Sequence, residues 1–182
     1  MSLFEIETSA FCTASPDELY ALVSDLPESG RWSPECIGGQ WISGEPCQVG
    51  ARFRGNNNRA TDVVAWAPVV RGGWQTESEI VAAEAPKQFS WSILNRSGEL
   101  QESVWSYFVD AAEGGSILRH HYRMGRPTEG ITEIMSHLDE EGKERFVREW
   151  GDKLRADMQT TVDAIARITE EASVVQKAGV SQ

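Results

Sequence analysis

A complete helix start near the N-terminus constrains this chain more than any other feature. Ser15 can accept a hydrogen bond from the amide of Glu18, and the Glu18 side chain can reach back to the amide of Ser15. Pro16 occupies the first helical position, where its missing N–H costs nothing. The pattern predicts a short helix over residues 16–24. The run Asp25-Leu26-Pro27-Glu28 predicts a second short helix over residues 26–32.

The rest of the chain, up to about residue 130, reads as strands. A first strand over residues 3–11 precedes the two helices. Turn signals rich in glycine and proline then separate six further strands. We expect them at about residues 37–44, 51–58, 74–83, 87–95, 102–110 and 116–124.

From Gly130 the apolar period becomes helical, and the last helix is the clearest periodic element. Its apolar stripe consists of Val147, Trp150, Leu154, Met158, Val162, Ile165 and Ile168. We expect only one side of this helix to be buried, because its other faces carry charges. These include Lys143, Arg148, Lys153, Arg155, Asp163 and Arg167. We predict one domain over residues 1–172. A disordered tail over residues 173–182 follows, because that segment has no apolar face.

Alternation along the strands predicts which side chains face the interior. Trp105 and Tyr107 share one face of their strand, and Leu118, His120 and Tyr122 share one face of the next. An antiparallel sheet lined in this way must have its apolar face covered, and the long helix is the available cover. The sequence therefore predicts an α+β fold in which a curved antiparallel sheet of about seven strands wraps around a long C-terminal helix.

Composition excludes several classes of protein. A net charge of −11 argues against nucleic acid as a partner. The longest apolar run, residues 63–70, is too short to span a bilayer, so we expect no membrane insertion. Cys12, Cys36 and Cys47 lack metal-site spacing and suit reduced thiols, which favours a cytoplasmic location. Phosphate-loop, dinucleotide-binding and nucleophile-elbow motifs are absent, so we expect no cofactor and no metal.

Four motifs in this order of elements resemble a known family. They are Trp32-Ser33-Pro34-Glu35, Gly50-Ala51-Arg52-Phe53-Arg54-Gly55-Asn56, Ala83-Glu84-Ala85-Pro86 before Phe89-Ser90-Trp91, and Trp105-Ser106-Tyr107. Over about residues 3–170 the chain resembles the START-like (SRPBCC) helix-grip superfamily, and within it the bacterial polyketide cyclase/dehydrase group. The resemblance implies the helix-grip fold and an internal cavity between the sheet and the C-terminal helix. Members of this group include cyclases, aromatases and carriers of lipids or hormones.

Aromatic residues fit such a cavity. The chain has 7 tryptophans, and each can bury a large surface while offering one N–H donor. Pockets for small organic molecules are lined mostly by aromatic and apolar groups. Filling of the core remains the alternative for each ring taken singly. The predicted ligand-binding residues are Trp32, Phe53, Trp74, Phe89, Trp91, Trp105, Trp150 and Leu154.

The predicted catalytic residues are His120, Tyr122 and Tyr107. An inward histidine could act as general acid or base in an enolisation or a dehydration, and the two phenols could hydrogen-bond a ligand carbonyl. The alternative for each is a structural role in the core. A strand bulge would shift the alternation by one residue and turn His121 inward in place of His120.

Two apolar segments suggest surfaces around the cavity. Residues 61–73 form a long connection that could lie over the cavity mouth or form a homodimer contact. Residues 131–138 carry a short helical stripe, which is either a lid or an extension of the last helix.

Three functions remain open at this stage. The first is a cofactor-free cyclase, aromatase or dehydratase acting on a hydrophobic small molecule. The second is a non-catalytic carrier of a lipid-like or polyketide ligand. The third is an interaction module that binds a protein through residues 61–73 or the acidic surface.

Overall fold

The computed structural model describes residues 2–179, which form a seven-stranded antiparallel sheet and its covering helices. The strands run in the spatial order β1-β7-β6-β5-β4-β3-β2. Their bounds are β1 Phe4–Cys12, β2 Cys36–Ser43, β3 Arg52–Arg59, β4 Gly72–Glu84, β5 Gln88–Leu94, β6 Leu100–Ala112 and β7 Gly115–Met124. The predicted fold class and strand count are confirmed.

The helix start near the N-terminus forms as predicted. Helix α1 spans Pro16–Ser24, and its capping box is complete. The Ser15 amide donates to Glu18 Oε2 at 2.9 Å, and the Glu18 amide donates to Ser15 Oγ at 3.4 Å. The 3₁₀ helix η1, Leu26–Arg31, follows at once and packs beside β2, while α1 lies against β5, β6 and β7.

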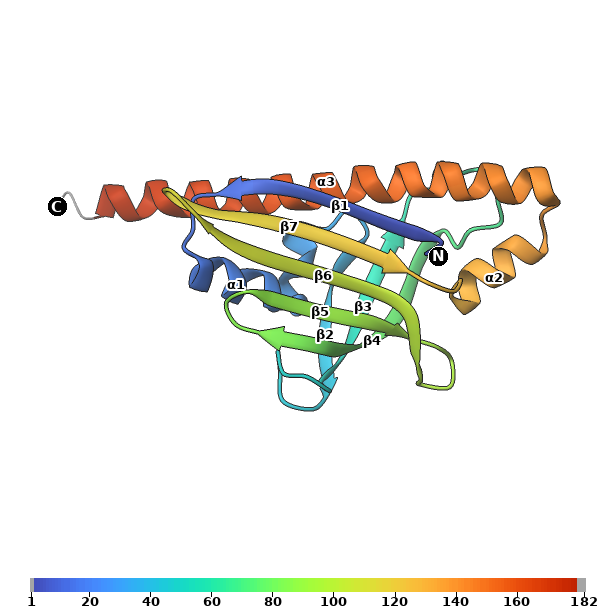
Figure 1. The fold of residues 1–182 in the computed structure, drawn as a ribbon, viewed down its shortest axis with the longest axis horizontal. Coiled ribbons are helices and arrows are strands. Elements are labelled where there is room, and N and C mark those ends of the chain that lie inside the picture. Colours follow the sequence, from blue (N-terminus) through green and yellow to red (C-terminus); the bar gives the residue numbers. More distant parts are fainter. Residues whose placement is uncertain (1, 180–182) are drawn as a thin grey trace.

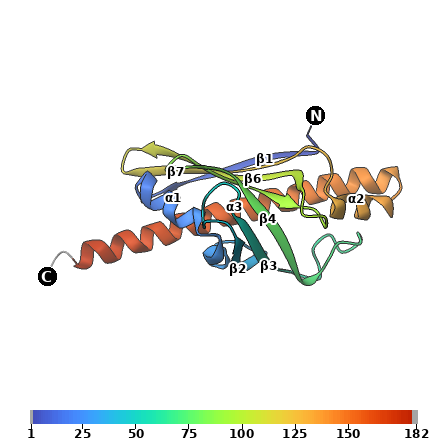
Figure 2. The ribbon, with the colours of Figure 1, turned by 90° about the horizontal axis from the view of Figure 1, so that it is seen from below.

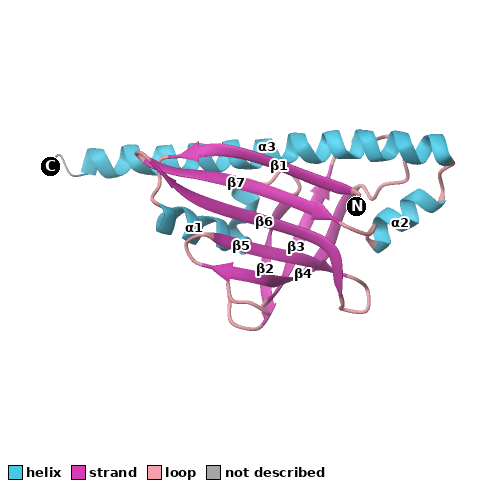
Figure 3. Ribbon diagram, viewed as in Figure 1, coloured by secondary structure: helices cyan, strands magenta, loops and turns pink. Residues whose placement is uncertain are grey.

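Helix α3, Glu140–Gly179, runs along the whole length of the sheet (Figure 1). Seen from below, α1 and α3 lie on the same side of strands β1, β6 and β7 (Figure 2). The far strands β2, β3 and β4 bend away from that plane, which gives the sheet its curvature (Figures 2 and 3). The closest packing of α3 is on β1, with a smaller contact on β7. The helix therefore covers one side of the sheet closely and leaves space over the rest.

Strand pairing places the inward side chains in two rows across the sheet. One row joins Trp91, Trp105 and Tyr122 on β5, β6 and β7, and the next joins Phe89, Tyr107 and His120 on the same strands. Both rows are regular where β6 pairs with β7, so no bulge shifts this part of the alternation. His120 is 5% exposed and faces inward.

Two helical regions differ from the predicted boundaries. Residues 129–136 form a separate helix α2, Glu129–Ser136, capped by Thr128, so the interpretation as an extension of the last helix is wrong. Helix α3 continues to Gly179, seven residues beyond the predicted domain end at residue 172. Gln, Lys and Ala in this segment are good helix formers, so the helix can continue there without an apolar face. The remainder of the predicted tail, residues 180–182, lies outside the described residues.

The connection before β4 folds into a tight loop around one side chain. The guanidinium of Arg71 donates hydrogen bonds to five backbone carbonyls, those of Thr61, Val63, Val64, Ala67 and Val69, at 2.9–3.3 Å. Trp66 packs against the core beside α3, and its Nε1 donates to Glu149 at 2.6 Å. The loop is therefore fastened to α3 rather than extended into solvent.

Replacing Arg71 by Met should release this loop. We expect a loss of roughly 2 kcal/mol in the free energy of unfolding, since several carbonyls lose a charged donor. Hydrogen exchange should accelerate in residues 61–71. Arg54→Met is the control, because its pair with Glu77 at 2.7 Å is on the outer face and 39% exposed. It should cost less than about 1 kcal/mol. Unchanged exchange in the loop of Arg71→Met would contradict this role.

Candidate functional site

A cavity of about 310 Å³ lies between the concave face of the sheet and α3. Of the predicted site residues, those that line it are Trp32, Phe53, Trp74, Trp91, Trp105, Tyr107, His120, Tyr122, Trp150 and Leu154. The volume is at the lower end of the range for small-molecule pockets. Whether these residues bind a ligand or catalyse a reaction stays a prediction.

Aromatic rings form a continuous wall along β5, β6 and β7. Trp105 stacks on Tyr122 with ring centroids 3.9 Å apart, and Trp91 lies 5.4 Å from Tyr107. The His120 ring lies between its neighbours, 4.6 Å from Tyr107 and 5.6 Å from Trp105. Each of these rings therefore packs against a neighbouring ring of the same wall.

Phe89 is the one predicted site residue that the cavity does not include. Its side chain is 0% exposed and packs in a separate core cluster with Leu26 and Ile80. Tyr20 of α1 meets its ring edge-on at 6.2 Å. Phe89 does face inward as alternation predicts, but α1 and η1 cover that part of the sheet. Phe89 is therefore outside this cavity, because alternation does not reveal which inward positions a helix covers, and its role in ligand binding stays a prediction.

His120 is a buried polar group without a partner. Within the described part of the chain, neither Nδ1 nor Nε2 forms a hydrogen bond of acceptable geometry. Burial lowers the pKa of His120 to about 3, and the nearby backbone of Met158 opposes this only in part. The imidazole is therefore neutral near pH 7, with one N–H donor and one acceptor. Leaving such a group unsatisfied costs roughly 1–3 kcal/mol.

The two tyrosines are protonated donors. Burial raises the pKa of Tyr122 to about 12, although a hydrogen bond with Ser103 at 3.2 Å lowers it slightly. Burial also raises the pKa of Tyr107, and the side chain of Trp32 opposes the shift. Both hydroxyls keep their protons at neutral pH, so they hydrogen-bond rather than ionise.

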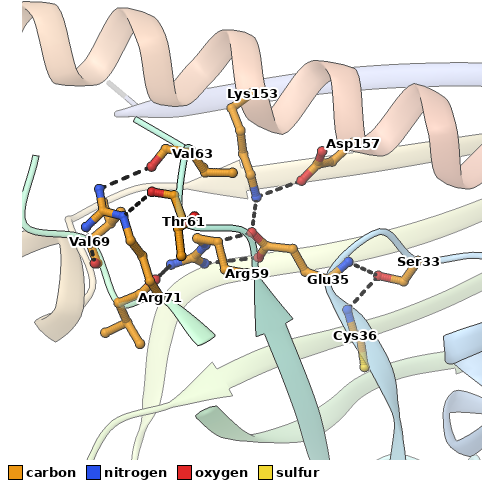
Figure 4. A network of polar contacts seen from close by, with 11 residues as sticks. Ser33, Glu35, Cys36, Arg59, Thr61, Val63, Val69, Arg71, Lys153 and Asp157 are labelled. Atoms are coloured by element: carbon orange, nitrogen blue, oxygen red, sulfur yellow. Dashed lines mark hydrogen bonds and ion pairs between the residues drawn. The ribbon is translucent and has the colours of Figure 1, made fainter. Parts of the chain in front are cut away.

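A charged network forms another part of the wall (Figure 4). Glu35 accepts two hydrogen bonds from Arg59, from Nε at 2.7 Å and from Nη2 at 3.0 Å. Lys153 reaches from α3 to both Glu35 and Asp157, the second at 2.6 Å. Burial alone would raise the pKa of Glu35, but the bonds from Arg59 and Lys153 outweigh burial and hold the pKa below its ordinary value. The network joins α3 to the β2 and β3 side of the sheet.

Aromatic rings enclose the Arg59 end of this network. The guanidinium lies 4.2 Å from the ring centroid of Trp74 and 4.9 Å from that of Trp150. Such cation–π contacts are strengthened where water is excluded. The side chain of Arg59 is only 10% exposed, so its charge is held by Glu35 and by the two rings.

Reasoning from the sequence missed this network. Lys153 was expected on a solvent-facing side of the last helix, but its side chain is 14% exposed and lines the cavity. The expectation is wrong because a long lysine beside the apolar stripe can reach inward to a buried carboxylate. A signal was present, since Lys153 and Asp157 are four residues apart and directly adjoin stripe residues Leu154 and Met158.

The cavity has a mouth beside α2. A wider groove shares Trp74, Ile131 and Trp150 with the cavity wall and extends between α2 and the loop that joins β5 to β6. Arg96 in that loop pairs with Glu133 of α2 at 3.1 Å. Pro68 and Val70 also border the groove, so the loop fastened by Arg71 lies at the mouth. A homodimer contact through that loop stays a prediction.

No group of three or more His, Cys, Asp or Glu side chains in residues 2–179 is placed to hold a metal ion. No helix in the same range combines the length and the apolar character needed to cross a membrane.

Together, the curved sheet, the covering helix and the aromatic cavity define a helix-grip protein. Residues 4–167 match the family described as polyketide cyclase/dehydrase and lipid transport, and the chain belongs to this family. The resemblance inferred from the sequence motifs is thereby confirmed. No curated protein matches the chain.

Solved structures agree with this assignment. A polyketide cyclase-like protein from Corynebacterium glutamicum is 27% identical, with a TM-score of 0.62 and coverage of 93% of each chain. The di-domain ARO/CYC StfQ of the steffimycin biosynthetic pathway has a TM-score of 0.66 at 11% identity, covering 93% of this chain and 51% of that one. An AHSA1-like protein from Aeromonas hydrophila has a TM-score of 0.57 at 15% identity, covering 93% and 94%. The last two likenesses show the fold alone.

The buried histidine predicts a pH dependence of stability. His120 has a folded pKa of about 3, below the ordinary value of 6.5, so the unfolded state binds the extra proton as the pH falls through 6.5. Stability should therefore fall with decreasing pH, by about 2 kcal/mol between pH 7.5 and pH 5 from this residue. Urea denaturation of His120→Gln should show a flatter profile over this range. The control His137→Gln, at an exposed position, should keep the wild-type slope. If the free energy of unfolding of His120→Gln and of the wild type changed equally with pH, the lowered pKa of His120 would be refuted.

Removing Glu35 should destabilise the protein by leaving two buried cations without their shared carboxylate. We expect Glu35→Ala to lower the free energy of unfolding by roughly 2–3 kcal/mol in urea denaturation. Glu77→Ala removes a carboxylate from the exposed pair with Arg54 and should cost less than about 1 kcal/mol. Equal losses in the two variants would mean that the network is no stronger than a surface pair.

Proposed function

We propose that the protein binds an oxygenated hydrophobic small molecule in its internal cavity and promotes its cyclisation, aromatisation or dehydration without a cofactor. The observation that carries this proposal is the cavity of about 310 Å³ between the sheet and α3, with its wall of aromatic rings. Membership of the polyketide cyclase/dehydrase and lipid transport family supports it. So does the likeness of fold to an ARO/CYC protein of a polyketide pathway.

The pKa values alter the role expected of His120. A histidine with a pKa near 3 is a weak base at neutral pH, so proton transfer by this residue is disfavoured. The protonated hydroxyls of Tyr107 and Tyr122, which line the same cavity, can instead donate to a ligand carbonyl and stabilise the negative charge that develops on enolisation. Positioning of a flexible ligand between these packed rings would supply the rest of the rate enhancement.

A carrier without catalysis is the second candidate. The same pKa shifts favour it, because the buried imidazole and the Tyr122 phenol titrate far from neutral pH. The two candidates predict the same binding and differ only in the fate of the ligand.

The test is native mass spectrometry of the protein after incubation with an extract of its producing organism. An enzyme should release a molecule that has lost water or that is an isomer of the one supplied. A carrier should release the molecule with its mass and retention time unchanged. Protein that retains nothing would refute both candidates.

A cavity-filling variant supplies the matched control. Thr76 lies on β4 and lines the cavity, whereas its exposed neighbour Gln75 hydrogen-bonds Asn56 on the other face. We expect Thr76→Phe to retain at least tenfold less ligand than wild type, because the added ring occupies the space. Because Gln75 itself borders the groove at the mouth, the control is Asn56→Phe, which adds the same ring at an exposed position outside both the cavity and the groove and should retain the wild-type amount. Equal retention by the two variants would place the ligand elsewhere.

A further inference from the structure

Two segments border the mouth of the cavity, and they are held in place very differently. The loop over residues 61–71 forms one lip of the groove, and helix α2 forms another. Ile131 of α2 and Trp150 of α3 border both the groove and the cavity, and they are only 6% and 7% exposed. The passage is therefore tight on this side, and an organic molecule needs one of the two segments to move.

The loop is fastened on several sides. Arg71 holds it from within through its hydrogen bonds to five carbonyls. Trp66 ties it to α3 through its indole N–H, and Arg145 of α3 lies 4.4 Å from the centroid of the same ring. Arg59 adds a hydrogen bond from Nη1 to the carbonyl of Val70 at 2.8 Å. The loop is therefore a fixed part of the mouth.

Helix α2 is held by far fewer contacts. Of its eight residues only Ile131 is buried, whereas α1, with nine residues, buries three. Its ion pair from Glu133 to Arg96 joins side chains that are 61% and 81% exposed. Glu129 accepts a further hydrogen bond from the Arg96 amide at 3.0 Å, also at an exposed position. Exposed contacts of this kind contribute little to stability, so α2 can open at low cost in free energy.

The connections of α2 allow it to swing as a unit. Figure 1 shows α2 beyond the ends of the strands, with a sharp turn between it and α3. Only residues 137–139 separate the two helices, and residues 125–128 join α2 to β7. Helix α3 is packed on β1 along the sheet. Displacement of α2 therefore moves Ile131 away from the mouth without unpacking α3 from the sheet.

We propose that α2 is a mobile lid whose displacement from the loop joining β5 to β6 admits ligand to the cavity. The loop over residues 61–71 is the fixed lip beside it. The inference rests on the first part of the proposed function, the binding of a small molecule in the cavity. A lid that must move for both entry and release limits both rates. Loosening it should therefore speed binding and dissociation alike and leave the affinity unchanged.

Stopped-flow fluorescence with N-phenyl-1-naphthylamine, an uncharged apolar probe, measures both rate constants. The latch variant Arg96→Ala/Glu129→Gln removes the pair with Glu133 and weakens the bond to the Arg96 amide. We expect its association and dissociation rate constants each to rise about threefold, with Kd unchanged. Asp110→Ala is the matched control, because it breaks an exposed pair with Arg119 at 2.8 Å that borders neither the cavity nor the groove. It should keep both wild-type rate constants.

Hydrogen exchange of the wild-type protein gives an independent readout. Amides of α2 should exchange about tenfold faster than those of α1, because α1 is a helix of nearly equal length with more buried side chains. In the latch variant α2 should exchange faster still, and α1 should not change. Exchange in α2 as slow as in α1 would contradict a mobile lid.

The outcomes separate this inference from the proposed function. Unchanged rate constants in the latch variant, or faster dissociation alone with a weaker Kd, would overturn the lid and leave the cavity as a binding site. Faster probe exchange in Arg71→Met but not in the latch variant would also overturn it, since the loop would then be the moving part. If the probe fails to bind the wild type, or binds Thr76→Phe equally well, the proposed function itself fails.

Discussion

The geometry of this protein depends on how α3 covers the sheet. The curved sheet is wider than the apolar stripe of the helix. The helix packs closely on β1 and β7 through residues such as Leu154 and Met158. It reaches the far side mainly through Lys153, which meets Glu35 beside Arg59. Close apolar packing on one side and an ionic bridge on the other leave a space between them, and that space is the cavity.

Charge and burial act together in the cavity wall. The network of Glu35, Arg59, Lys153 and Asp157 neutralises itself, so charged groups can line an apolar space without a ligand to compensate them. His120 differs because it is neutral and has no protein partner in the described chain. The low pKa that burial gives His120 makes it a poor proton carrier at neutral pH.

Local signals predicted most of the fold. The capping box of α1, the turn residues between strands and the stripe of α3 all depend on near neighbours, and each appears where the pattern indicated. Alternation along β6 and β7 correctly turned Tyr107, His120 and Tyr122 inward, since both strands pair without a bulge. The same reasoning could not separate cavity from core. Phe89 faces inward like its neighbours, but α1 and η1 pack over it.

By itself, the sequence determined the order of elements, the inward faces of the central strands and the family. These depend on the period of the apolar residues, on the helix-capping residues and on short sequence motifs. Only the tertiary structure decided which inward groups share a space. Glu35 and Lys153 are separated by 118 positions, and no local pattern relates them. Their meeting requires the curvature of the sheet and the path of α3 across it. The isolation of His120 is likewise a property of three-dimensional packing, since a missing hydrogen bond is defined by everything that surrounds the ring.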